Sequence, residues 1–149
     1  DVIARHAAEE AYGTLTPPGL TVRFDIPKSD VVVPSKQATI LALLINEIVA
    51  NAVKHGFQGR DRGIISITAV EDNGDAVVEI ANDGVAISNN FDPTESRGLG
   101  MRIVQRLVTA DLNGDFHIGP TDHGSVAVVR FPIASEEANA PLAPITRKA

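Results

Sequence analysis

The longest helical pattern in the chain, residues 35–55, sets the strongest limit on the fold. At about 100° per residue, its large apolar side chains gather on one face of a helix. They are Leu41, Leu44, Ile45, Ile48 and Ala52. Gly56 follows as a stop signal. A helix with one apolar face must cover another layer, so the neighbouring segments have to supply a surface for it.

Segments predicted to be strands lie on both sides of this helix. The five segments are residues 20–26, 64–70, 76–81, 116–118 and 125–133. The first alternates apolar and polar side chains, which is the period of a strand. Asn73-Gly74 lies between the second and third segments, and this pair is typical of a tight antiparallel hairpin. The sequence pattern therefore predicts strands grouped in antiparallel pairs.

Two further helices are predicted, at residues 2–12 and 100–110. The second would turn four apolar side chains inward: Ile103, Val104, Leu107 and Val108. Paired strands with helices between them predict an α+β fold, a two-layer sandwich in which helices cover one face of a mixed, mostly antiparallel sheet. We expect residues 1–133 to form one domain. Residues 134–149 have few large apolar groups and are expected to be a disordered tail.

Composition excludes several classes of function. The chain has no cysteine, which excludes disulfides and cysteine-ligated zinc. Its formal net charge of -6 lacks the positive field that non-specific nucleic-acid binding needs. No apolar run approaches the roughly 20 residues of a membrane span, and no secretory signal pattern is visible. We expect a cytoplasmic domain without nucleic acid and without direct membrane contact.

The long helix also carries a polar stripe beside its apolar face. Glu47, Asn51 and Lys54 fall within about 60° of one another on the helical wheel. Mg²⁺ prefers oxygen ligands and is usually held by one or two protein oxygens together with substrate phosphates. Glu47 and Asn51 suit that task, and Lys54 could meet phosphate as a point charge. The alternative is a solvated helix face on which Asn51 is merely tolerated.

Two glycine-containing segments follow. Residues 82–86, Asn-Asp-Gly-Val-Ala, come directly after a predicted strand, and residues 97–100, Arg-Gly-Leu-Gly, directly precede a helix. Glycine allows close approach of backbone to a ligand, and a helix N-terminus favours phosphate. The same segments could equally be turns and a helix start. The chain lacks the GxxxxGK[ST] of a P-loop and the GxGxxG of a Rossmann βαβ unit.

Taken in order, these segments resemble the GHKL ATPase superfamily, which includes histidine kinases, gyrase-type topoisomerases, MutL and ATP-dependent chaperones. NEIVANAVKHGF resembles its N-box, NDGVA a variant of its first glycine box, RGLGMRIV its second, and GSVAVVRFPI its closing strand. The Lys-His-Gly-Phe at residues 54–57 is most similar to sensor histidine kinases. Phe-Asp-Pro at residues 91–93 resembles a compact-lid subgroup, and the lack of tryptophan places the chain outside a related subgroup marked by that residue.

The resemblance implies a Bergerat-type ATP-binding fold that uses ATP and Mg²⁺. It implies that Glu47 orients or deprotonates the incoming histidine and that Asn51 coordinates the Mg²⁺ that bridges the ATP phosphates. It further implies that Lys54 and His55 touch phosphate or ribose.

The glycine boxes and the closing strand complete the implied site. Asn82 stands where the family usually has an aspartate that accepts a hydrogen bond from the adenine amino group, and Gly84 would give the base room. Ser125 would reach adenine through water. The second glycine box would close over the phosphates with Arg97, Gly98, Leu99 and Gly100.

Two residues depart from the family's usual Asp-x-Gly-x-Gly. The amide oxygen of Asn82 can accept the same hydrogen bond, but without charge, so we expect weaker nucleotide binding. Ala86 replaces the second glycine and is expected to stiffen the lid hinge.

The resemblance thus implies the ATP-binding catalytic domain of a two-component sensor histidine kinase. His6 reads as an ordinary helical residue, so the phosphoacceptor histidine is expected on an upstream dimerisation domain outside this chain. The other expected partners are a response regulator receiver domain and a second copy of the full-length protein. Two alternatives stay open: a serine kinase of the anti-sigma-factor type, and a degenerate phosphotransfer or scaffold domain that has lost ATP.

Overall fold

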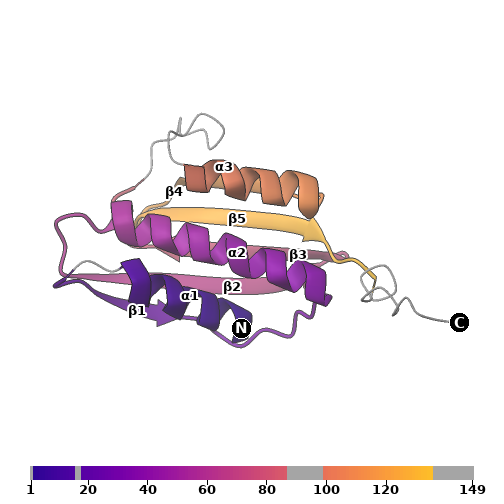
Figure 1. The fold of residues 1–149 in the computed structure, drawn as a ribbon, viewed down its shortest axis with the longest axis horizontal. Coiled ribbons are helices and arrows are strands. Elements are labelled where there is room, and N and C mark those ends of the chain that lie inside the picture. The colour runs from indigo at the N-terminus through magenta and orange to yellow at the C-terminus, as the bar shows by residue number, and fades with distance from the viewer. Residues whose placement is uncertain (1, 16–17, 87–98, 136–149) are drawn as a thin grey trace, which may run out of the picture.

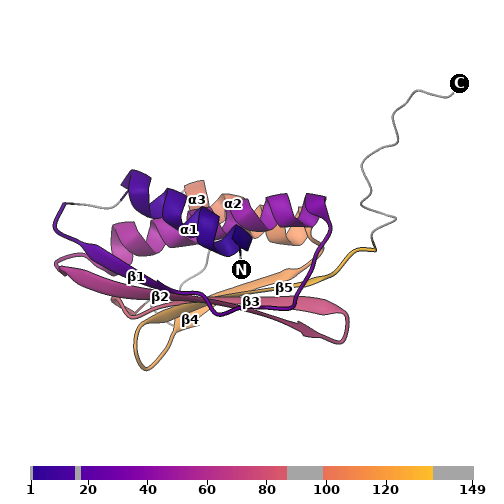
Figure 2. The ribbon, with the colours of Figure 1, turned by 90° about the horizontal axis from the view of Figure 1, so that it is seen from below.

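The computed structural model describes residues 2–15, 18–86 and 99–135. Within these ranges, five strands form one sheet in the order β1-β2-β3-β5-β4. They are β1 (Thr21–Asp25), β2 (Arg62–Asp72), β3 (Asp75–Asn82), β4 (Asp115–Pro120) and β5 (Ser125–Pro132). Only the β1–β2 pair among them is parallel. Helices α1 (Val2–Leu15), α2 (Ser35–Asn51) and α3 (Leu99–Arg106) cover one face of the sheet (Figures 1 and 2). The predicted α+β sandwich is confirmed.

Alternation along the strands builds the core. Along β5, the first half of β2 and β3 up to Ile80, every second side chain is buried beneath the helices, as the period of two requires. These side chains are Ile65, Ile67, Ala76, Val78, Ile80, Ala127, Val129 and Phe131. Between β2 and β3, Asn73 and Gly74 have φ angles of 51° and 85°. Two consecutive left-handed residues match a type I′ turn, so the predicted hairpin is confirmed.

Helix α2 is the central helix of the layer and lies between α1 and α3 (Figure 1). Leu44, Ile45 and Ile48 are buried as predicted, whereas Leu41 is only half-buried. By length and composition alone, Ser35–Gly56 could also cross a membrane. Its buried side chains belong to the core formed with the sheet, which is the position of a core helix.

The α2 helix does not continue regularly to residue 55. It gives way at Ala52 to a π-helical turn, η1 (Ala52–Gly56). A π turn is wider than an α turn, so a side chain that the α-helical wheel places on one face is shifted around the axis. This shift changes which residues of the polar stripe lie together.

One prediction for the last helix is wrong. Helix α3 continues into a second π turn, η3 (Leu107–Asp111), and the buried side chains are Met101, Val104 and Val108. This stripe follows the 3- and 4-residue spacing of a helical face. Ile103 precedes Val104 by one residue, about 100° around the helix, and is 40% exposed. The prediction overlooked Met101, which anchors the first turn.

The N-terminal end of α2 is tied to the end of the sheet through one buried amide. The Gln37 Nε2 donates to the Pro132 carbonyl oxygen at 2.9 Å, and its Oε1 accepts from the Ala134 N–H at 3.0 Å. Both ends of the amide are therefore paired within the protein. Ala134 is held against the domain, while residues 136–149, most of the predicted tail, lie outside the described residues.

Candidate functional site

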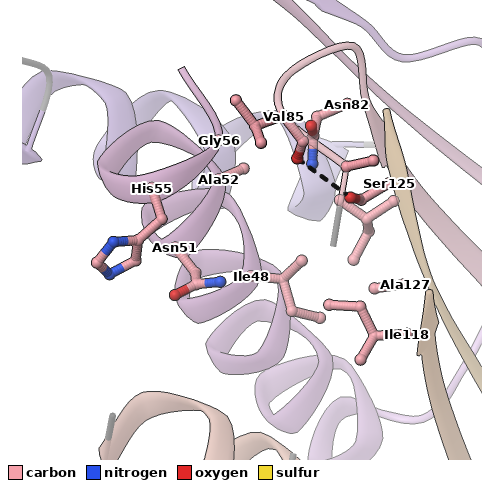
Figure 3. A pocket seen from close by; sticks show the side chains of 12 residues that line it. Ile48, Asn51, Ala52, His55, Gly56, Asn82, Val85, Ile118, Ser125 and Ala127 are labelled. Atoms are coloured by element: carbon pink, nitrogen blue, oxygen red, sulfur yellow. Dashed lines mark hydrogen bonds between the residues drawn. The ribbon is translucent and has the colours of Figure 1, made fainter. Parts of the chain in front are cut away.

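A cavity of about 190 Å³ opens at the C-terminal end of α2, between η1 and the ends of β3 and β5 (Figure 3). Pockets for drug-sized ligands are usually larger, about 300–1,000 Å³, so this volume suits a single heterocycle. Its walls combine apolar side chains with a few polar groups. The lining residues are Ile48, Asn51, Ala52, His55, Gly56, Ile80, Asn82, Val85, Ala86, Ile118, Ser125 and Ala127.

Three predicted site residues meet across this cavity. Asn51 is the last residue of α2, Asn82 ends β3, and Ser125 begins β5 as the register partner of Asn82. The Ser125 Oγ donates to the Val85 carbonyl oxygen at 3.5 Å. The half-buried Asn51 amide has no hydrogen-bond partner among the described residues. Because partly buried amides normally find partners, Asn51 is poised for a ligand.

Gly84 lies behind the cavity wall and does not line it. A Cβ atom at position 84 would overlap the Gly56 carbonyl oxygen, which also accepts the Val85 N–H at 2.7 Å. The Gly84 N–H donates to Asn82 Oδ1 at 2.9 Å. Gly84 therefore shapes the cavity indirectly, because it lets the loop after β3 pack directly against the end of η1. That it gives a nucleotide base room stays a prediction.

Gly124 has a similar role that sequence reasoning missed. A Cβ atom there would overlap the Asn82 carbonyl oxygen and approach the Asp83 Cα to 2.9 Å. Only glycine fits between the two strand ends without shifting the backbone. The available signal was the position of Gly124, immediately before the Ser125 that sequence reasoning selected.

The π turn separates Lys54 from His55. On an α-helix, residues three apart lie on the same side, which is why Lys54 was grouped with Asn51. The π turn of η1 contains more residues per turn, so a step of three residues covers a smaller angle around the axis. Lys54 is therefore rotated away from Asn51. His55 lines the rim of the cavity, with its imidazole directed away from the Ser125 side (Figure 3), whereas Lys54 is exposed and is not among the lining residues.

Glu47 lies one turn before Asn51 and faces helix α3. A Cβ atom at position 100 would lie 2.6 Å from Glu47 Oε2, so the carboxylate touches the open side of Gly100. The structure thus brings Glu47, Asn51 and the start of α3 to one side of α2. Leu99 begins α3, while Arg97 and Gly98, like residues 91–93, lie outside the described residues.

The charged neighbour of Asn82 points away from the cavity. Asp83 Oδ1 accepts the Ile64 N–H at 2.7 Å, and its carbonyl oxygen accepts from Arg60 at 2.6 Å. In the described part of the chain, no three His, Cys, Asp or Glu side chains gather to hold a metal. A divalent cation held near Asn51 would therefore depend on ligand phosphates and water for most of its coordination, as Mg²⁺ commonly does.

An apolar slot with a polar end, beside one free amide and one carboxylate, suits a base that carries phosphates. A model of the family described as histidine kinase-, DNA gyrase B-, and HSP90-like ATPase matches residues 36–135. The chain belongs to this family. The resemblance to the GHKL superfamily is thereby confirmed. The match covers the cavity, α3 and every strand except β1.

Relatives among curated proteins are sensor kinases. The chain is 34% identical over 104 residues to the sensor histidine kinase PdtaS of Mycolicibacterium smegmatis, covering 68% of this chain and 21% of PdtaS. It is 25% identical over 117 residues to blue-light-activated histidine kinase 2 of Erythrobacter litoralis, covering 78% of this chain and 34% of that protein. The chain thus spans only about a fifth to a third of these relatives.

Solved structures show the same fold. The histidine kinase domain of an Erythrobacter litoralis blue-light-activated kinase superposes with a TM-score of 0.72 at 23% identity, covering 91% of this chain and 63% of that one. The ATP-binding domain of PrrB from Mycobacterium tuberculosis gives 0.71 at 23% identity, covering 90% and 93%. This member of the ATPase family therefore has the fold of histidine kinase ATP-binding domains.

Proposed function

We propose that this chain is the ATP-binding catalytic domain of a sensor histidine kinase. The observation that carries the proposal is the pair formed by Asn51 and Glu47. The unpartnered Asn51 amide opens onto a cavity of the size of one heterocycle, and Glu47 lies one helical turn away against α3. Base, phosphates and reacting group then have separate places along one edge of α2.

In this proposal the adenine occupies the slot between Ile48 and Ile80, with its polar edge toward Asn82 and Ser125. The triphosphate leaves the slot toward Asn51 and the N-terminal end of α3, where free backbone N–H groups and the helix dipole favour anions. Asn51, aided by solvent and phosphate oxygens, would hold Mg²⁺, which neutralises phosphate charge when bound.

Glu47 orients the imidazole of the acceptor histidine or takes its proton as the phosphoryl group transfers. A carboxylate that acts on a histidine from another domain must not be bonded to groups of its own domain. Glu47 has no such partner among the residues described. Transfer then depends mainly on alignment and charge neutralisation, as in phosphoryl transfer generally.

The acceptor histidine belongs to a dimerisation domain outside this chain. We infer that the full-length protein is a homodimer in the cytoplasm and that its phosphohistidine passes the group to an aspartate of a response regulator. The similarity to PdtaS and to the blue-light-activated kinase, both named histidine kinases, supports this assignment.

Two measurements test the proposal. Titration of the chain with a fluorescent ATP analogue, with Mg²⁺ and then with EDTA, is expected to show binding that Mg²⁺ strengthens. Mixing the chain with radiolabelled ATP and the histidine-bearing domain of the same protein is expected to label that domain with acid-labile phosphate. The Glu47→Gln variant should keep ATP binding and lose transfer. Acid-stable label on a serine, or no Mg²⁺-dependent binding at millimolar nucleotide, would overturn the proposal.

A further inference from the structure

The polar side chains that the described residues contribute to the cavity include no carboxylate. Among the described lining residues they are Asn51, His55, Asn82 and Ser125. An ionised carboxylate can only accept hydrogen bonds, whereas an amide or a hydroxyl can both donate and accept. A wall of this kind does not force its ligand to present a donor.

The carboxylate that follows Asn82 in the chain is held outside the cavity. Asp83 follows Asn82 directly, but its Oδ1 accepts the Ile64 N–H at 2.7 Å, and Arg60 donates to its carbonyl oxygen at 2.6 Å. Rotation of Asp83 into the cavity would leave the Ile64 N–H without this acceptor and would cost free energy. Of these two neighbours, only Asn82 is therefore placed to form hydrogen bonds with a ligand in the cavity.

The orientation of the Asn82 amide is set by the backbone. Its Oδ1 accepts the Gly84 N–H at 2.9 Å, which identifies the oxygen end, since the opposite orientation would set two donors against each other. The oxygen keeps a second lone pair and the amide keeps its two N–H donors. One fixed amide thus offers an acceptor and a donor side by side.

The two kinds of purine edge complement that pair to different degrees. Adenine has an amino donor at position 6 beside the acceptor N1, so it can form two hydrogen bonds with the fixed Asn82 amide. Guanine and hypoxanthine have a carbonyl acceptor at position 6 beside an N1–H donor, which is the reverse order, so they can form one, from Nδ2–H to the carbonyl oxygen. A carboxylate at position 82 would repel that oxygen.

We propose that Asn82 makes the nucleotide site tolerant at purine position 6, so that the chain binds GTP and ITP within about tenfold of ATP, a difference of one neutral hydrogen bond. This inference rests on the proposed function. It deepens that function by assigning the base specificity of the site to one amide.

The test compares three nucleotides on three proteins. Unlabelled ATP, GTP and ITP compete in Mg²⁺ buffer against a ribose-labelled fluorescent ATP analogue. The proteins are the native chain, Asn82→Asp and the matched control Asp83→Asn, which keeps an acceptor for the Ile64 N–H. ITP isolates position 6, because it differs from GTP only by lacking the 2-amino group.

For the native chain, the Kd of ITP is expected to exceed that of ATP by less than about tenfold. Asn82→Asp is expected to favour ATP over ITP by about 100-fold or more, because charged hydrogen bonds are roughly twice as strong as neutral ones and the carboxylate repels the 6-oxo group. Asp83→Asn should match the native ratio.

A native preference for ATP over ITP of more than tenfold would overturn the inference and leave the proposed function intact. So would an Asn82→Asp variant, folded by circular dichroism, with the native ratio. If that variant does not fold, the native ratio alone decides. If no triphosphate competes at all, the proposed function fails together with the inference.

Discussion

Helix α2 carries one critical amide at each end, and the two are treated in opposite ways. Near the N-terminal end, Gln37 is buried and both its oxygen and its nitrogen are bonded to the chain around β5. At the C-terminal end, Asn51 is half-buried and has no partner among the described residues. An amide that the protein satisfies serves the fold, whereas one left open at a cavity is available to a ligand. The same chemical group thus has a structural role at one end of the helix and is open to a ligand at the other.

Loss of the open amide should have the largest effect, and the effect should be on binding alone. Asn51→Ala is expected to weaken Mg²⁺-dependent ATP binding about 100-fold, roughly 2.7 kcal/mol, because the proposed Mg²⁺ ligand is removed. The measurement is titration with a fluorescent ATP analogue, with urea denaturation as a check that stability is unchanged. A variant that loses stability but still binds Mg²⁺-ATP would reverse the contrast between the two amides.

The cavity end should also be sensitive to added bulk. Gly84→Ala places a methyl group onto the Gly56 carbonyl oxygen, a backbone atom that cannot rotate away. We expect a loss of about 2.5 kcal/mol in the free energy of unfolding and weaker ATP binding, because the cavity wall must shift. Gly74→Ala in the distant hairpin is the control, since nothing lies near its Cβ position and only its φ of 85° opposes alanine. Equal binding by both variants would show that the Gly56–Gly84 contact does not shape the cavity.

Loss of the paired amide should affect stability alone. Gln37→Met keeps the volume but leaves the Pro132 carbonyl and the Ala134 N–H without partners. We expect the free energy of unfolding in urea to fall by about 2 kcal/mol. The Kd for ATP should stay within twofold of the native value, and a larger change would mean that the two ends of α2 are coupled.

The smallest effect is expected at the ion pairs near Gln37's end of the sheet. Arg130 contacts Asp75 at 2.8 Å and Asp72 at 3.1 Å, and these hydrogen bonds, that of Asp72 foremost, raise the pKa of Arg130. A raised pKa means that its stabilisation is present at all ordinary pH values and is lost only as pH rises through that value. Because these groups are exposed to solvent, Arg130→Met should lower the melting temperature by no more than about 2 °C. The prediction would be contradicted if the melting temperature of Arg130→Met fell further than this and 1 M NaCl did not lower that of the native chain to a similar extent.

Much of the fold and part of the site could be predicted from sequence because the signals are local. Asn73-Gly74 fixes its own turn, and alternation fixes which side of a strand is buried. The location of Asn51 beside the apolar face follows from helical periodicity. These features depend on residues close in sequence.

The remaining features depend on contacts between distant segments. The π turn that turns Lys54 away from the cavity has no signature in a helical wheel. The need for glycine at position 124 arises from the approach of the Asn82 backbone, 42 positions earlier in the chain. Ile103 was misplaced because Met101, not Ile103, fills the space above the sheet.

The packing of Gly84 and Gly124 against neighbouring main chain gives the cavity a support behind its wall that has no exchangeable side chains. Point mutations cannot cut that support back, since there is nothing left to trim, and any addition to it meets peptide atoms. Changes in ligand choice by point mutation would therefore fall on the side chains that line the cavity, Asn82 and Ser125 among them. A laboratory evolution experiment on this domain would accordingly randomise the lining positions and leave the two glycines unchanged.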